Sequence, residues 1–166
     1  MKLQSPLGTL PERLRPVRAL LCEAVQRGVC SVDELGTELR TTPRPGTALI
    51  RKAVADVIAG CRSAPECDLR DTIRRSRILP EPRWNQPLPG FERIKPDACW
   101  PEARLVVEVD SVAWHRHGDR YEATEKRRAL YARLGWRVIP VSPFRLRTEP
   151  REIQREIEQA YQAGLH

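Results

Sequence analysis

The acidic residues best suited to chemistry lie in one stretch, Ile94 to His117, which reads IKPDACWPEARLVVEVDSVAWHRH. Two strand-like runs, Ile94–Cys99 and Arg104–Asp110, flank a turn at Trp100–Ala103. Side chains alternate along a strand, so Val106, Glu108 and Asp110 share one face and Leu105, Val107 and Val109 the other.

A hairpin centred on Pro101-Glu102 would put Asp97 opposite Val106 and diagonal to Glu108. Diagonal neighbours are roughly 7 Å apart, so Asp97, Glu108 and Asp110 could converge at the strand end. Charges inside a Val- and Leu-rich strand require partners, and carboxylates with water suit Mg²⁺ or Mn²⁺. The spacing therefore predicts a divalent-metal site formed by these three acids, and equally allows a solvated face of acids pointing outward.

Two histidines follow the acidic strand, in Trp114-His115-Arg116-His117. A neutral imidazole could serve as general base or ligand, and a charged one could contact phosphate. We expect His115 to act as acid/base at the acidic site and His117 to contact nucleic acid. The alternative is a surface loop with solvated histidines.

Basic residues come next along the chain and could hold a phosphate backbone. The candidates for nucleic-acid contact, besides His117, are Arg116, Lys126, Arg127, Arg145 and Arg147. Glu122 and Glu125 offer the alternative of pairing along a solvated helix. Trp84, Trp100 and Trp114 could stack on bases or pack in a core.

Glu66 stands in the capping box Ser63-Ala-Pro-Glu66, where its expected role is to cap a helix. It could also supply a fourth carboxylate if that helix packed beside Asp97.

Composition sets the class of protein. The 166 residues carry a formal charge of +7 and a pI near 9.6, which makes a polyanion a plausible partner. The five cysteines form no CxxC pair, and no signal core or membrane span is visible. We expect a cytoplasmic protein with reduced thiols that does not bind membranes.

Periodicity predicts helices at about 11–28, 31–40, 47–59, 63–77, 119–134 and 149–163, and strands at 83–88, 94–99, 104–110 and 136–141. Residues 142–148 read as a short basic turn. The first helix should bury Leu14, Val17, Leu20, Leu21, Ala24 and Val25, and the third Leu49, Ile50, Ala53, Val54, Val57 and Ile58. This order predicts an α/β protein with a mixed sheet flanked by helices. Residues 1–60 would form an N-terminal helical extension and 61–166 the sheet domain.

The motif from Asp97 to His115 has the form D-x-x-W-P-x-x-x-L-x-x-E-x-D-x-x-x-x-H, and GWRVIPVSPFRLR follows. Over Ser63 to Ala163 the chain resembles the very-short-patch-repair-like branch of the PD-(D/E)xK nuclease superfamily. More narrowly, it is similar to a bacterial domain of unknown function that often follows a winged helix related to abortive-infection antitoxins.

The resemblance implies a restriction-endonuclease-like core of four mixed strands with helices on both sides. Asp97 and Glu108 match the two acids of the motif, His115 matches its histidine, and Glu66 matches an acid on the first helix. The sequence departs from the pattern at Asp110, where the superfamily usually has lysine. It also departs at Ser111, where glycine is usual, and on the following helix, where Thr124 and Arg128 replace two acids and Arg127 remains.

Two functions remain open on these grounds. The first is a Mg²⁺-dependent DNA endonuclease or nickase. The second is a catalytically degenerate nuclease-fold module that binds DNA or a protein partner in phage defence or a toxin–antitoxin pair. A weaker third possibility is a partner-binding or homodimerising role for residues 11–60.

Overall fold

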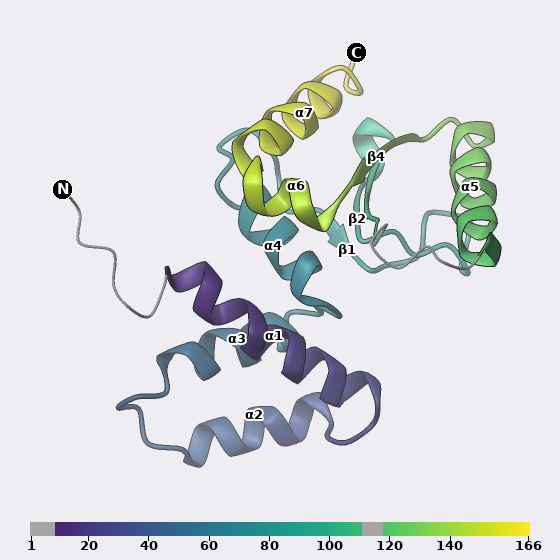
Figure 1. Cartoon of the computed structure of the whole chain (residues 1–166). Helices are drawn as coiled ribbons and strands as arrows, with labels where there is room; N and C mark the ends of the chain where they lie inside the picture. Colours follow the sequence, from purple (N-terminus) through teal and green to yellow (C-terminus); the bar gives the residue numbers. More distant parts are fainter. Residues whose placement is uncertain (1–8, 111–117) are drawn as a thin grey trace. The chain divides into compact units, whose positions relative to one another are not determined.

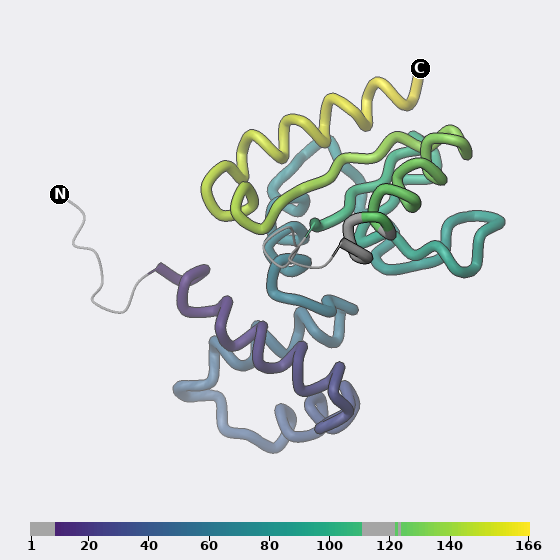
Figure 2. Tube along the Cα trace, turned by 45° about the vertical axis from the view of Figure 1, so that its right-hand side comes forward, coloured from purple at the N-terminus to yellow at the C-terminus, as the bar shows by residue number. Residues whose placement is uncertain are grey.

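A computed structural model describes residues 9–110 and 118–166, which fall into two compact units, Met1–Cys67 and Asp68–His166. In Figure 2 the first unit runs from purple to blue and the second from blue to yellow. The division follows Cys67, whereas the sequence suggested one after Gly60. Cys61 and Cys67 are both buried in the core of the first unit with Cys22, which explains the later boundary.

The N-terminal unit contains the three predicted helices, α1 (Leu10–Gln26), α2 (Val32–Thr41) and α3 (Ala48–Ile58). Capping boxes at Thr9–Glu12 and Ser31–Glu34 begin α1 and α2 by satisfying backbone N–H groups that have no partner within the helix. Figure 1 shows α1 and α3 side by side, and the two helices are in extensive contact.

The buried face of α1 differs from the predicted one. Leu14, Arg18 and Cys22 are buried, spaced four residues apart, while Leu20 is exposed. On α3 the prediction is right for Ala53, Val54 and Val57 and wrong for Ile50 and Ile58, which are exposed. On α1 the prediction is right for Leu14 and wrong for Leu20, and it did not foresee that Arg18 is buried.

An ion pair joins the two helices and accounts for that arginine. Arg18 donates from Nε to Asp56 Oδ2 at 2.8 Å, and its Nη2 lies 2.6 Å from the same oxygen. The two side chains are only 1% and 7% exposed. This close contact compensates two charges that are both buried.

Helix α4 (Ala64–Ile73) begins at the predicted capping box but ends before the expected Arg77. The Ser76 hydroxyl accepts hydrogen bonds from the N–H groups of Ile78 and Leu79, at 3.0 Å each. This local turn replaces further helical turns.

The sheet of the C-terminal unit has the order β1 (Arg83–Trp84), β2 (Ala98–Trp100), β3 (Leu105–Val109) and β4 (Arg137–Val141). The β1–β2 and β2–β3 pairs are antiparallel and β3–β4 is parallel. The predicted mixed α/β fold is therefore confirmed. Strands β1 and β2 are shorter than expected, since Pro87, Pro89 and Pro96 cannot donate to a ladder.

The turn between β2 and β3 is a 3₁₀ turn (η1, Pro101–Ala103) followed by Arg104 in the left-handed conformation, with φ of 45°. Ala98 pairs with Val107 and Trp100 with Leu105. The predicted register, with Asp97 opposite Val106, is therefore wrong. Continued beyond its last pair, the observed register places Asp97 across from Glu108.

Three helices complete this unit: α5 (Gly118–Arg133), α6 (Pro143–Thr148) and α7 (Pro150–Gln162). Helix α5 is the crossover that a parallel β3–β4 pair requires. The prediction of a basic turn at 142–148 was wrong, because Ser142 caps α6 by accepting a hydrogen bond from Arg145 N–H at 3.2 Å.

The two faces of the sheet carry different cores, and Figure 1 shows helices on both sides of it. Leu105 and Val107 pack with residues of α4, α6 and α7 on one face, and Val106 packs with Cys99 and Tyr131 of α5 on the other. The predicted alternation along β3 is confirmed. Among the described residues, no helix is long and apolar enough to cross a membrane.

The buried Arg18–Asp56 pair yields a stability prediction. Asp56→Ala should lower the free energy of unfolding of the N-terminal unit by about 3 kcal/mol, because it leaves a buried guanidinium without its partner carboxylate. Urea denaturation followed by circular dichroism measures this change. Lys52→Ala is the matched control, since the half-exposed Lys52 is 3.9 Å from Asp56 and should change stability by less than about 1 kcal/mol. Equal effects of both substitutions would contradict the assignment.

Candidate functional site

Asp97 lies just before β2 and is partly buried. Its Oδ2 accepts a hydrogen bond from Val109 N–H at 2.7 Å. Val109 lies beyond the last β2–β3 pair, Ala98–Val107. At this position the Asp97 side chain, not a backbone carbonyl, accepts the hydrogen bond from β3. Asp97 thereby ties the end of β3 to the neighbouring strand.

Glu108 projects from β3 on the face covered by α5, and its side chain is 12% exposed. Tyr131 of α5 donates its hydroxyl hydrogen bond to Glu108 Oε1 at 2.5 Å. Arg127 Nη1 lies 3.9 Å from the same oxygen. Tyr131 follows Arg127 by four residues, so one helix face supplies both groups.

The protonation states of Glu108 and Tyr131 follow from their surroundings. Burial raises the pKa of Glu108 above its ordinary value, and the hydrogen bond from Tyr131 and the charge of Arg127 partly offset that effect. Burial, together with the neighbouring Glu108, raises the pKa of Tyr131 well above the usual range. The phenol therefore stays protonated at neutral pH and acts as a donor.

Asp110 follows β3, and its N–H donates to Val141 O of β4 at 2.9 Å. Its carboxylate pairs with Arg128 of α5, which also donates to Glu125 at 2.8 Å. The side chains of Asp110 and Arg128 are 15% and 35% exposed. Asp110 thus lies beside a guanidinium of α5.

Asp97, Glu108 and Asp110 all lie near the carboxyl end of β3. The charge of Asp97 acts on the pKa of Tyr131, and the charge of Asp110 on that of Glu108. Within 9–110 and 118–166, however, no three His, Cys, Asp or Glu side chains converge closely enough to hold a metal ion by themselves. Any ion at this site would need further ligands.

The predicted site also included two histidines, an arginine and Glu66. His115, Arg116 and His117 are outside the described residues. Glu66 accepts hydrogen bonds from Arg62 N–H at 3.0 Å and from the Ser63 hydroxyl at 2.9 Å, as a capping residue does. It belongs to the N-terminal unit, whereas Asp97 belongs to the C-terminal one.

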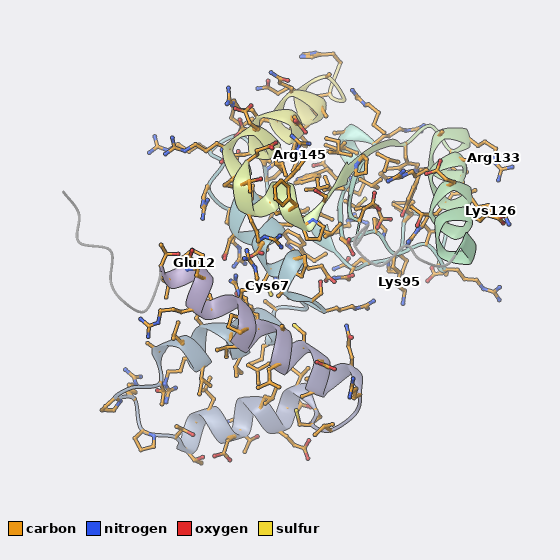
Figure 3. The ribbon with its side chains drawn as sticks, viewed as in Figure 1. Glu12, Cys67, Lys95, Lys126, Arg133 and Arg145 are labelled. Atoms are coloured by element: carbon orange, nitrogen blue, oxygen red, sulfur yellow. The ribbon has the colours of Figure 1, made fainter. Side chains whose placement is uncertain are left out.

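The remaining basic candidates have different surroundings. Lys126 pairs with Glu122 at 3.3 Å, and Figure 3 shows it on the outer side of α5, pointing away from the sheet. Arg145 is held by Glu149 at 2.9 Å and by Glu156 at 2.5 Å. Arg147 lies over the ring of the exposed Phe144. Of these candidates, Arg127 is the one in contact with a site acid.

Sequence reasoning missed Tyr131 and treated Arg128 as a replacement for a lost acid. A helical projection of 118–133 would have shown that Arg127, Arg128 and Tyr131 occupy neighbouring positions on the helix surface. It could not have indicated that this surface faces Glu108 and Asp110.

The raised pKa of Glu108 yields a prediction about stability and pH. A carboxyl whose folded-state pKa is raised contributes stability below its unfolded pKa and loses it as the pH rises through the folded value. Glu108→Gln keeps an acceptor for Tyr131 and removes the charge, so its melting temperature should exceed that of the wild type at neutral pH. The difference should shrink toward pH 4. Thermal melts across this range test it, with the exposed Glu122→Gln as control; a wild type that gains stability relative to Glu108→Gln as the pH rises would contradict it.

Comparison with known proteins gives relatives without a described activity. No protein-family model matches the chain, and no solved structure matches it. It is similar to two proteins of Mycobacterium tuberculosis, uncharacterized protein MT2308 of strain CDC 1551 / Oshkosh and uncharacterized protein Rv2248 of strain H37Rv, with 28% identity over 164 residues in each case. The similarity covers 95% of this chain and 56% of each relative, so the chain spans about half the length of the curated relatives it matches.

Proposed function

We propose that the C-terminal unit is a Mg²⁺-dependent DNA endonuclease or nickase that hydrolyses phosphodiester bonds. One observation carries the proposal: Asp97 and Glu108 come to the same end of the sheet from two neighbouring strands, beneath arginines of α5. Acids for a cation and guanidiniums for phosphate are the two components that phosphodiester hydrolysis requires.

The donor set is compatible with magnesium. Mg²⁺ prefers oxygen ligands, keeps several waters, and is usually held by one or two carboxylates together with phosphates of the substrate. Asp97 and Glu108 would hold it, with Asp110 as a further ligand or as a group that orients water. When bound, the ion would activate water and stabilise negative charge on the phosphoryl group. Because substrate oxygens contribute ligands, three converging protein side chains are not required.

The chain's own residues have distinct tasks in this proposal. Tyr131 fixes the orientation of Glu108 by donating to Oε1. Arg127 and Arg128 neutralise the phosphates, so Arg128 supplies the positive charge that lysine usually provides in the resembling nucleases. His115 would transfer a proton as acid/base. Lys126, Arg116, His117, Arg145 and Arg147 would contact the nucleic-acid backbone.

Amide variants of Asp97 and Glu108 remove the negative charge and keep the hydrogen bonds that these side chains accept. Asp97→Asn keeps an oxygen for Val109 N–H, and Glu108→Gln keeps one for Tyr131, while each removes a metal-binding charge. Either substitution should reduce nicking of supercoiled plasmid in Mg²⁺ by at least about 100-fold, as expected for the loss of a group needed in the transition state. Agarose gels measure the rate of nicking.

The matched control is Glu102→Gln. Glu102 is an exposed acid that accepts a hydrogen bond from Tyr161 at 3.2 Å, and its substitution should leave the rate of nicking unchanged. Chelation of divalent cations should abolish cleavage by the wild type. Full activity in both Asp97→Asn and Glu108→Gln would exclude this mechanism.

A second candidate is a nuclease-fold module that binds DNA or a protein partner without cutting. The observation that favours it is that Asp97, Glu108 and Asp110 each already accept a protein donor. Such a module would bind DNA with an affinity that falls steeply with salt, and it would leave plasmid intact in Mg²⁺ and in Mn²⁺.

A further inference from the structure

Two arginines of α5 act as counter-ions of the acidic site. Arg128 is paired with Asp110 and bonded to Glu125, and Arg127 Nη1 lies 3.9 Å from Glu108. Their side chains are 35% and 50% exposed, whereas those of Asp110 and Glu108 are 15% and 12% exposed. The carboxylates are thus held in the protein, and the guanidiniums lie at its surface.

This difference in exposure determines which partner can move. A half-exposed arginine is long, keeps its charge in any position, and binds a phosphate through two parallel hydrogen bonds. Glu108 lies on β3 and is bonded to Tyr131, and the backbone of Asp110 is bonded to β4. Both side chains are shorter than arginine and have less freedom. A phosphate that approaches α5 therefore competes with Asp110 and Glu108 for the same two guanidiniums.

Loss of a guanidinium leaves a poorly solvated carboxylate without its counter-ion, which is unfavourable. A divalent cation removes that penalty, because it binds the carboxylates that the arginines have left. A cation bound first would in turn displace the arginines toward the phosphates. The two binding events assist each other, and linkage requires the assistance to be equal in both directions.

We propose that Arg128, assisted by Arg127, exchanges its carboxylate partner for a phosphate of the nucleic acid, so that binding of the phosphodiester chain and of a divalent cation are positively coupled. This inference rests on the proposed function, since it concerns the same acids and the same ion. It adds that the acidic site is fully open to a cation only when a polyanion is bound.

The sign of the coupling separates this exchange from ordinary electrostatics. Mg²⁺ competes with protein cations for phosphates and therefore weakens most protein–DNA complexes. Partner exchange predicts the opposite, with tighter DNA binding in Mg²⁺. We expect about a fivefold gain, at the lower end of typical coupling because the Arg128–Asp110 pair is partly exposed.

The test is the fluorescence anisotropy of a short fluorescein-labelled duplex titrated with the full chain, with Mg²⁺ or with NaCl of equal ionic strength. Arg128→Gln should bind more weakly and lose the gain in Mg²⁺. Asp110→Asn should bind more tightly than the wild type without Mg²⁺, since it frees Arg128, and should gain less when Mg²⁺ is added. Because these two variants change affinity in opposite directions, a general loss of folding cannot imitate the result.

Lys126→Ala is the matched control. Lys126 lies on the same helix but pairs with Glu122 on its outer side. Its removal should weaken binding similarly with and without Mg²⁺, and the fivefold gain should remain. Weaker wild-type binding in Mg²⁺, no binding of the duplex, or a gain that survives in Arg128→Gln would each overturn the proposal.

Gels of the same samples distinguish this inference from the proposed function. Cleavage without the gain would leave the nuclease proposal intact and overturn the exchange. The gain without cleavage would support the exchange in a module that binds the ion and the duplex but does not cut.

Discussion

A carboxylate held inside the sheet is the constraint on which the C-terminal unit depends. Glu108 lies on a strand otherwise made of Leu and Val, and burial raises its pKa. Such a group requires a donor from whatever covers that face. The parallel pairing of β3 with β4 demands a crossover helix, and α5 meets both requirements: it returns the chain and provides Tyr131 and Arg127.

The same arrangement is costly for stability. A hydrophobic residue at position 108 would pack against Val106 and Tyr131 without desolvating a charge. Keeping an acid there, and tying Asp97 to the same strand end, makes sense where the acids meet a cation or a donor from a ligand. The buried Arg18–Asp56 pair differs, because its two charges are both deeply buried and bonded to each other. Partly exposed counter-ions distinguish the acidic site from that internal pair.

The sequence allowed the alternation of β3, most helices and the mixed sheet to be predicted, because these depend on local periodicity. It did not allow the register of Asp97 to be predicted, since that depends on Arg104 adopting a left-handed conformation after a 3₁₀ turn. Tyr131 was missed for a related reason: its role depends on how α5 is rotated against the sheet. The burial of Arg18 on α1 was not foreseen because its partner, Asp56, lies far away in the sequence.

If the proposed nuclease function holds, the acid at position 110 has a physical interpretation. A lysine there would be a fixed positive charge within the strand, whereas Asp110 with Arg128 places the positive charge on a helix. A guanidinium on a long, partly exposed side chain can reach a phosphate in several positions. A lysine on the strand could reach it in only one of them. In the proposed nuclease, the positive charge would therefore stand on a side chain that can move, and Asp110 would be open to a cation once the guanidinium had left.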